Sequence, residues 1–451
     1  MKKLFGILAS MLAAVLLLPG AASAAGNQAK IGDTEYVTLL AAVNAAEDGD
    51  TITLIENVAL TLPVKINKSL TIDLGGFTVS RSNYSFDVYN ELTLKNGTVQ
   101  LNYSTAAESR AAIWLREDAK LTVAEDVTVQ AIENNEPGWA IGLYSDVDGA
   151  TLIFNGTIKG EGGITVNGKV TTNNTIQINN GAKIETAGSA FYQAGNATTT
   201  IGAATLTSGT TAVEVRAGTL TLDGATLTTT GQFSEKPNGN GLTTSGVALA
   251  VSQHTTNQPI NVTVNSGSLT GEKAFYEADL QDDEASSEFV TLSLAGGNYN
   301  GAVASVNHTE FVSGGIFSQP VEAAYVVPAS TVANRTSGDT TTYFIGTPTT
   351  VAAYLADTKA GDAIEVTQGD LELAALPGDV TVKNTGEGTV TANGETATAE
   401  GVTTVAPAEP ETDPISPPTG DAFNPVVWVI VTGLAAILFG ATLYQSRKQR
   451  R

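Results

Sequence analysis

Few residues of this 451-residue chain are suited to chemistry. Cysteine is absent, which excludes disulfides, thiolate metal sites and a cysteine nucleophile. The two histidines, His254 and His308, lie in separate corner-like stretches, so we expect both on the surface. Arg116 and Arg216 are expected to form surface salt bridges. The formal charge of −23 argues against nucleic acid as a partner, because phosphate binding needs clustered Lys and Arg.

The acids with the best placement for catalysis are Asp87 and Glu214. Both fall in one outward-facing row of the repeat described below, which we call the outward row. Its members are Asp87, Trp114, Gly142, Thr165, Tyr192, Glu214, Ala250 and Tyr276. A glycosidase needs two carboxylates facing one bond, whereas several turns, more than about 15 Å, separate this pair. We therefore predict no catalytic residue. The aromatic members Trp114, Tyr192 and Tyr276 are candidate contacts for a sugar or protein ligand.

An acidic loop offers the one candidate metal site. Asp282, Asp283, Glu284 and Glu288 carry the oxygen ligands that Ca²⁺ prefers. The ordered spacing of an EF-hand loop is missing, so a solvated acidic loop is the favoured interpretation. We predict no cofactor.

The middle of the chain repeats a short strand in which apolar residues flank a central residue, usually Thr. The strands are Leu70-Thr71-Ile72, Leu92-Thr93-Leu94, Leu121-Thr122-Val123, Leu152-Ile153-Phe154, Ile176-Gln177-Ile178, Leu220-Thr221-Leu222, Val262-Thr263-Val264 and Leu292-Ser293-Leu294. Such alternation indicates strands with one face buried. Most are followed by a turn with Gly, often after Asn or Asp, and these residues tolerate the left-handed backbone of a tight corner.

A small residue before a strand recurs about every 27 residues. These residues are Ser85, Ala112, Ala140, Gly163, Ala190, Ala212, Ala248, Ala274 and Ala302. A period of 20–50 residues indicates a solenoid or a propeller, but a propeller blade needs a longer period. The pattern predicts an all-β fold: a right-handed parallel β-helix over 51–327, with inward aliphatic residues stacked into a core and corner Asn residues bonded to one another. Insertions at 232–242 and 281–288 should project from its side.

The two flanks of the solenoid carry different signals. Residues 25–50 predict a cap with a helix, because Tyr36, Leu39, Leu40 and Val43 follow helical spacing, with Asp33 or Thr34 as N-cap. Residues 328–404 predict a separate small β-rich module with one helix, joined through 331–342. A Pro- and acid-rich wall spacer follows at 405–415.

The opening LLAAVNAAEDGDTITLIENV resembles the start of pectate-lyase-like β-helix domains in bacterial surface proteins. The resemblance covers about residues 30–325 and implies the fold more than an activity. Polysaccharide-cleaving members of this class combine a calcium cluster with Arg or Lys, or use several close Asp residues, often with Gly-His-Gly. No Gly-His-Gly occurs in this chain.

The N-terminus has the pattern of a secretory signal peptide over 1–24. Lys2 and Lys3 form the basic region, an apolar stretch follows, and Ala22-Ser23-Ala24 provides a small-residue cleavage site. A membrane anchor is the alternative interpretation. The signal places the mature chain outside the cell.

The C-terminus combines three elements. Ser416, Pro417, Pro418, Thr419 and Gly420 precede an uncharged transmembrane segment at 426–444 and a basic tail at 445–451. This order resembles the LPxTG-like sorting signal of Gram-positive cell-wall surface proteins, with Ser416 in place of Leu. The resemblance implies that a sortase cleaves between Thr419 and Gly420 and joins Thr419 to peptidoglycan. The alternative is a plain single-pass membrane protein with a Pro-rich linker.

Three functional classes follow from these observations. The first is a cell-wall-anchored, non-enzymatic surface protein that displays a β-helical rod for adhesion to, or interaction with, a host or matrix protein or glycan. The second is a wall-anchored polysaccharide lyase or glycoside hydrolase. The third is an ice-binding or crystal-templating solenoid, which needs Thr-x-Thr pairs on consecutive turns, whereas the sequence indicates one Thr per turn. We favour the first class. We expect the protein to reach the cell wall from the plasma membrane, where it is first a single-pass precursor.

Overall fold

A computed structural model describes residues 26–102, 110–132, 138–145, 147–238, 241–278 and 286–405. The predicted signal peptide, sorting motif, membrane segment and basic tail lie outside these residues, as do Asp282, Asp283 and Glu284. Within the described part, no helix is long and apolar enough to cross a membrane. The chain divides into two compact units, Met1–Val405 and Ala406–Arg451, and the described residues all belong to the first.

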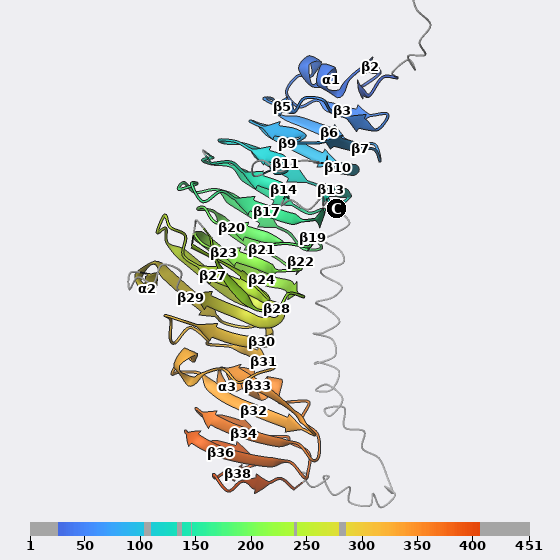
Figure 1. Ribbon diagram of the computed structural model, residues 1–451. Helices are drawn as coiled ribbons and strands as arrows, with labels where there is room; N and C mark the ends of the chain where they lie inside the picture. Colours follow the sequence, from blue (N-terminus) through green and yellow to red (C-terminus); the bar gives the residue numbers. More distant parts are fainter. Residues whose placement is uncertain are drawn as a thin grey trace, which may run out of the picture. The chain divides into compact units, whose positions relative to one another are not determined.

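The fold is all-β and is dominated by parallel pairing between strands about one sequence repeat apart (Figure 1). From β6 onward, most strands pair with the third strand after them in the chain. This produces three long ladders, which we call the first, second and third faces. The arrangement is solenoid-like and compatible with the predicted β-helix.

The first face has the strands β3 (Thr51–Leu54), β6 (Leu70–Asp73), β9 (Glu91–Lys95), β12 (Lys120–Val123), β15 (Thr151–Phe154), β18 (Thr175–Ile178), β21 (Thr198–Ile201), the start of β24 (Gly218–Thr229), the start of β28 (Ile260–Ala278) and β29 (Val290–Leu294). The second face has β4 (Val58–Ala59), β7 (Thr78–Arg81), β10 (Gly97–Asn102), β13 (Val127–Ile132), β16 (Thr157–Gly160), β19 (Lys183–Thr186), β22 (Thr205–Ser208), the end of β24, the middle of β28, the start of β30 (Asn298–Ser305) and β31 (Gly315–Phe317). The third face has β5 (Val64–Ile66), β8 (Phe86–Val88), β11 (Arg110–Leu115), β14 (Gly138–Leu143), β17 (Gly162–Val166), β20 (Phe191–Gln193), β23 (Thr211–Val215), β27 (Val247–Ser252) and the ends of β28 and β30.

The predicted aliphatic core is confirmed. In β6, Leu70 and Ile72 are buried while Thr71 between them is half-exposed. Equivalent residues stack from strand to strand, as Leu92 does on Leu121 in the parallel pair β9–β12. One continuous hydrophobic cluster extends along the three faces. Alternation of residue types was sufficient to predict which side chains face inward.

The corners and the recurring small residues also have clear physical causes. Asn96 adopts a left-handed φ of 58°, as expected of a corner residue. At another corner, Asn179 Nδ2 donates to Asn155 Oδ1 over 2.8 Å, so the predicted bonding between stacked Asn residues occurs there. A Cβ at Gly163 would overlap the carbonyl oxygen of Ala190, so this member of the recurring small residues has no room for a side chain.

At the N-terminal end, β1 (Ala29–Ile31) pairs antiparallel with both β2 (Thr34–Tyr36) and β3, and α1 (Leu39–Ala45) follows. The predicted N-cap at Asp33 or Thr34 was wrong. Residues 34–36 form a strand instead, and Thr38 caps α1 by accepting from the Ala41 N–H over 3.0 Å. The helix buries Leu39, Ala42 and Val43.

The C-terminal part has its own hydrophobic cluster. Its elements are η1 (Ala323–Tyr325), β32 (Thr331–Ser337), β33 (Thr340–Gly346), α3 (Pro348–Tyr354), β34 (Ala363–Gln368), β35 (Leu371–Leu373), β36 (Thr381–Glu387), β37 (Val390–Ala392), β38 (Glu395–Thr396) and β39 (Val402–Thr403). The expected joining segment 331–342 was wrong, because it lies in the paired strands β32 and β33. Strand β33 also pairs antiparallel with β31 of the second face, so the sheet continues into this part.

Candidate functional site

The outward row lies on the third face in the register expected from the sequence. Trp114 pairs with Asp87 on one side and Gly142 on the other, and the pairing continues through Thr165 and Tyr192. It ends with Glu214, Ala250 and Tyr276 on successive strands. The sequence repeat therefore placed these eight residues in one line.

The expected exposure of the outward row was wrong. Trp114 is 5% exposed and Glu214 is 0% exposed, and Asp87 and Tyr276 are also buried. Alternation showed that these residues point away from the aliphatic core, but it gave no information on what covers them. Trp114, Tyr192 and Tyr276 are consequently not an open ligand stripe.

Part of the cover comes from tryptophan rings lying over glycines. A Cβ at Gly142 would overlap the ring of Trp114 from the preceding strand. A Cβ at Gly162 would lie 2.9 Å from Cε3 of Trp139, which pairs with it. The Trp139 ring then stacks on Tyr192, with centroids 5.9 Å apart and an interplanar angle of 27°. The glycines of one strand thus leave room for the large rings of the neighbouring strand.

A hairpin covers the later part of the row. Strands β25 (Ser234–Asn238) and β26 (Gly241–Ser245) pair antiparallel within the insertion that was expected to project from a corner. Phe233 packs edge-on against Tyr276 with centroids 5.2 Å apart. The Lys273 ammonium lies 3.8 Å from the Phe233 centroid and 3.7 Å from that of Tyr276. The insertion therefore folds onto the third face.

Glu214 and Arg216 form a fully buried ion pair. Arg216 Nε donates to Glu214 Oε1 over 2.7 Å, and both side chains are 0% exposed. The Arg216 guanidinium lies 5.2 Å from the Tyr192 ring centroid. Burial raises the pKa of Glu214, while Arg216 opposes that shift, and burial also raises the pKa of Tyr192 to about 12. The expected surface salt bridge is an internal one.

His254 was expected on the surface and is buried. Its ring occupies the space beside Gly168, and the nearby Gln258 Nε2 donates to the Val170 carbonyl over 3.1 Å. The segment after β27 therefore lies against the loop between β17 and β18, which is much earlier in the chain. Burial and then the charge of Arg216 lower the pKa of His254.

A second acid–arginine pair, Asp87 and Arg116, lies nearer the N-terminus. Arg116 Nε donates to Asp87 Oδ1 over 2.5 Å. Burial lowers the pKa of Arg116, but the hydrogen bond and charge of Asp87 outweigh that effect and the net shift is upward. The guanidinium lies 4.0 Å from the Tyr144 ring centroid and 5.7 Å from that of Tyr89. Unlike the buried pair, this one borders two exposed rings.

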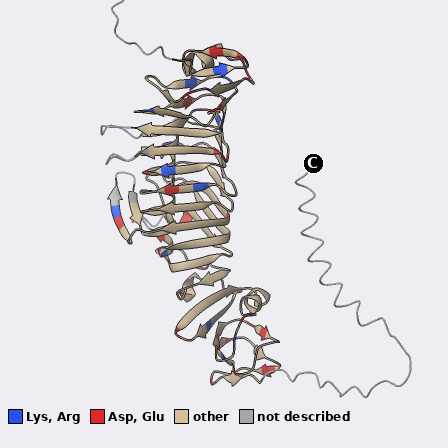
Figure 2. Cartoon of the chain, turned by 90° about the vertical axis from the view of Figure 1, so that its right-hand side faces the viewer, with Lys and Arg blue, Asp and Glu red and all other residues tan. Residues whose placement is uncertain are grey.

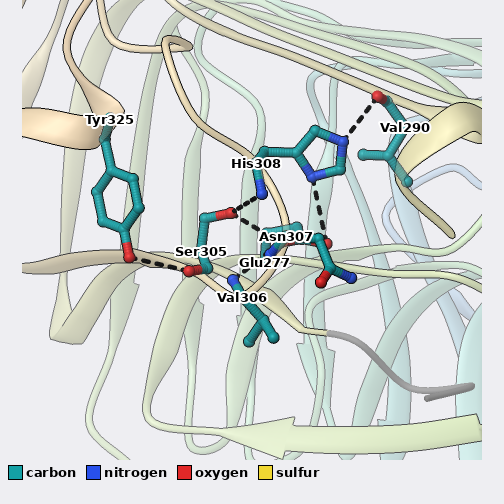
Figure 3. Close-up of polar contacts among 7 residues, drawn as sticks. All are labelled: Glu277, Val290, Ser305, Val306, Asn307, His308 and Tyr325. Atoms are coloured by element: carbon teal, nitrogen blue, oxygen red, sulfur yellow. Dashed lines mark hydrogen bonds and ion pairs between the residues drawn. The ribbon is translucent and has the colours of Figure 1, made fainter. Parts of the chain in front are cut away.

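A third polar cluster surrounds Glu277 at the end of β28 (Figure 3). Its Oε2 accepts from Ser305 Oγ over 2.8 Å and from the backbone N–H groups of Val306 and Asn307 over 3.0 and 3.1 Å. His308 Nδ1 lies 3.5 Å from Oε1, and its Nε2 lies 3.0 Å from the Val290 carbonyl oxygen. Burial raises the pKa of Glu277, but His308 and these donors outweigh it and the net shift is downward.

This cluster has the residue types of a hydrolytic relay without its geometry. The Ser305 hydroxyl donates to the carboxylate of Glu277, whereas a serine nucleophile needs a base such as the His308 ring to take its proton. Ser305 also accepts from the His308 backbone N–H over 2.8 Å. The contacts therefore fix the turn after β30, and His308 is half-buried instead of on the surface.

The two acids of the outward row do not face each other, and the described residues hold no cluster of metal ligands. Asp87 and Glu214 lie on β8 and β23, with four strands of the third face between them. No group of three or more His, Asp or Glu side chains in the described ranges is arranged to hold a metal ion. Glu288, the described member of the acidic loop, is exposed in α2 (Ser286–Phe289).

The outer surface of the first face carries more threonine than the sequence pattern indicated. Thr198 and Thr200 of β21 pair with Thr219 and Thr221 of β24, so Thr-x-Thr pairs occupy consecutive strands. The next strands continue with Asn and Thr, and then Thr and Ser, as the pairs Asn261/Thr263 and Thr291/Ser293. Figure 2 shows that many strands of the described unit carry few charged residues. The expectation of one Thr per turn was wrong here because residues outside the short apolar motif also face outward.

Comparisons with protein-family models, with curated proteins and with solved structures find no match to this chain.

Sequence reasoning missed the exposed aromatic residues of the third face. Tyr89 and Tyr144 follow the outward row by two residues, which is the strand period, so extending the row would have found them. Trp139 precedes Gly142, the outward-row residue of its strand, by three residues. Because three is not a multiple of the strand period, the repeat does not predict that Trp139 faces outward.

Proposed function

We propose that the protein is an exported, cell-wall-anchored surface protein that displays a right-handed parallel β-helix for adhesion or interaction. The observation that carries the proposal is the unbroken parallel pairing of the three faces over one continuous core. Stacked coils give an elongated surface on which each coil contacts only its neighbours. The segment with α1, β1 and β2 serves as the N-terminal cap in this proposal.

The display role is favoured over catalysis by the burial of the charged residues in the outward row. Glu214 and Arg216 are sealed by the elements that cover the third face, so a polysaccharide does not reach them in this conformation. The lyase or hydrolase alternative predicts unsaturated products or new reducing ends from polygalacturonate or wall polysaccharides. If the protein forms such products and Glu214→Gln does not, the display function is refuted in favour of the enzyme.

Anchoring is proposed from the sequence pattern around Thr419 and is tested by one substitution. Thr419→Ala should move the protein from the muramidase-released fraction to the membrane fraction, because the acyl bond to the wall is not formed. Thr403→Ala, at an exposed site before the sorting motif, is the matched control and should leave the distribution unchanged. Equal wall release of Thr419→Ala and wild type would refute sortase anchoring.

The Thr-x-Thr pairs of β21 and β24 favour ice binding as a second candidate function. β-branched side chains on a strand have restricted rotamers, so their hydroxyl and methyl groups form a regular, uncharged array. Thermal hysteresis measured on the protein is the test. Activity that falls when Thr200 and Thr221 are changed to Lys, but persists in Thr122→Lys, would support this candidate, whereas absence of hysteresis would remove it.

A further inference from the structure

The third face carries aromatic residues that the outward row did not reveal. We define the aromatic strip as Tyr89, Tyr144, Trp139 and Tyr192, which lie on or directly after β8, β14 and β20. Tyr89 is 42% exposed and Tyr144 is 39% exposed, while Trp139 and Tyr192 are half-buried. Aromatic side chains are costly to leave in water, and rings gathered on one face are typical of a binding surface.

The strip is held in place by contacts that restrict its rings. Trp114 packs edge-on against Tyr144 with centroids 5.3 Å apart and an interplanar angle of 88°. Arg116 lies between Tyr89 and Tyr144 and is fixed by its bond to Asp87. A ligand that binds these rings therefore loses little affinity to ordering of the side chains.

The spacing of the rings follows the ladder. Tyr89 follows β8 and Tyr144 follows β14, two coils later, and Tyr192 lies two coils after that on β20. Strands stack about 4.8 Å apart, so these three rings lie on coils about 10 Å apart along the ladder. Tyr192 is in register with Gly142 and is therefore offset by two residues from the position of Tyr144. A linear polymer with a regular repeat can contact several of these positions at once.

Strand pairing and charge identify the kind of polymer. The strands of the third face from β8 to β20 are paired on both sides, so a peptide cannot bind by adding a strand. Arg116 is already neutralised by Asp87, which leaves the exposed Lys65, 5.4 Å from the Tyr89 ring centroid, as a cation beside the strip. The chain as a whole carries a formal charge of −23, which disfavours a polyanion. Sugar rings present apolar faces that pack on aromatic rings and need no opposite charge.

We propose that the aromatic strip binds a neutral polysaccharide chain lying along the ladder of the third face. This inference rests on the proposed display function and names its ligand class. Binding to the strip does not require wall attachment, so the anchoring experiment and the binding experiment can fail independently.

The test uses the full chain purified in detergent, with xylan, mixed-linkage β-glucan and galactomannan as neutral probes and polygalacturonate as the acidic probe. Affinity electrophoresis and calorimetry should show binding to at least one neutral probe. Tyr144→Ala and Trp139→Ala should each weaken that binding about tenfold, the scale of one lost aromatic contact. Tyr343→Ala, on β33 outside the strip, is the matched control and should bind as the wild type does.

Two further measurements keep the outcome decisive. Tyr144→Phe should retain binding and fold, which separates loss of the ring from loss of stability. Affinity for the neutral probe should not change with salt concentration, because no ion pair is formed. The proposal is overturned if no neutral probe binds, if only polygalacturonate binds, or if both alanine variants bind like the wild type.

Discussion

Glu214 and Glu277 are both buried on the third face, two strands apart in its ladder, and the pKa shifts of their carboxyl groups are opposite. Glu214 is fully buried and accepts from Arg216 and, over 3.5 Å, from the Ser252 hydroxyl, and burial raises its pKa. Glu277 has His308, two backbone N–H groups and a hydroxyl, and its pKa is lowered. The two carboxyl groups differ both in the donors that face them and in how deeply they are buried, and the balance of these two effects decides which one stays ionised.

The largest effect is expected from breaking the buried pair. Arg216→Met leaves the Glu214 carboxyl buried without its partner and should lower the free energy of unfolding by about 3–5 kcal/mol. The double variant Glu214→Leu with Arg216→Met removes both charges and should lie close to the wild type. Chemical denaturation measures both. Equal destabilisation of the single and double variants would show that packing, and not charge, determines the loss.

A smaller effect is expected at Glu277. Glu277→Gln weakens three hydrogen bonds to the carboxylate and should cost about 2–3 kcal/mol near pH 7. The matched control is Glu185→Gln, which breaks the exposed pair of Glu185 with Lys159 and should cost less than about 1 kcal/mol. A Glu277→Gln variant as stable as this control would mean that the turn after β30 is held by other contacts.

The two glutamates should also give stability profiles of opposite slope with pH. Glu277 has a lowered pKa in the folded state, so its contribution is present above the unfolded value of 4.5 and is lost as the pH falls through the folded pKa. The deficit of Glu277→Gln should therefore shrink in acid. Glu214 has a raised pKa, so its favourable contribution below 4.5 is lost as the pH rises through the folded value.

Denaturation series between acidic and neutral pH check these slopes. Compared with the Glu214→Leu/Arg216→Met variant, the wild type should lose relative stability as the pH rises above 4.5. Burial and then the Arg216 charge lower the pKa of His254, and the variant lacks that charge, so both proteins carry His254→Gln in this series. Parallel profiles for the two proteins would contradict the raised pKa of Glu214.

The smallest effect is expected at Tyr325, which contacts Glu277 only through Ser305. The Tyr325 hydroxyl donates to the Ser305 carbonyl over 2.9 Å, and Ser305 in turn donates to Glu277. Tyr325→Phe should cost about 1 kcal/mol, the typical value of one neutral hydrogen bond. In a Glu277→Gln background the same change should cost less if the contacts are coupled. Simple additivity would show that Tyr325 acts independently of the carboxylate.

The sequence was most informative where a residue's position depends on the repeat. The register from Asp87 to Tyr276 and the stacked Leu92 and Leu121 follow from periodicity alone, because each coil repeats the geometry of the last. The Thr34–Tyr36 strand was missed because Tyr36 fits the helical spacing of Leu39 and Val43. A strand of three residues is too short to show its own alternation. The candidate site was less predictable.

The outer cover of the third face could not be derived from the repeat. His254 is buried because a segment folds back to Gly168 and Val170, and Tyr276 is buried because of Phe233 in an insertion. These contacts are specific to single coils and leave no periodic signal. Glu277 was overlooked for a related reason: it pairs with Val251, at a position that is aliphatic on most strands of the third face but is Gln193 on β20.

The large sheet has antiparallel pairs towards both ends of the chain, β1 with β3 at the start and β39 with β36 at the finish. A reversed neighbour offers a hydrogen-bonding edge that does not match the next parallel strand of another molecule. Two copies are thereby discouraged from joining end to end into a fibre. Gain or loss of an internal coil would leave both terminal strands intact. The number of coils can therefore change over evolution without exposing a new unpaired strand edge.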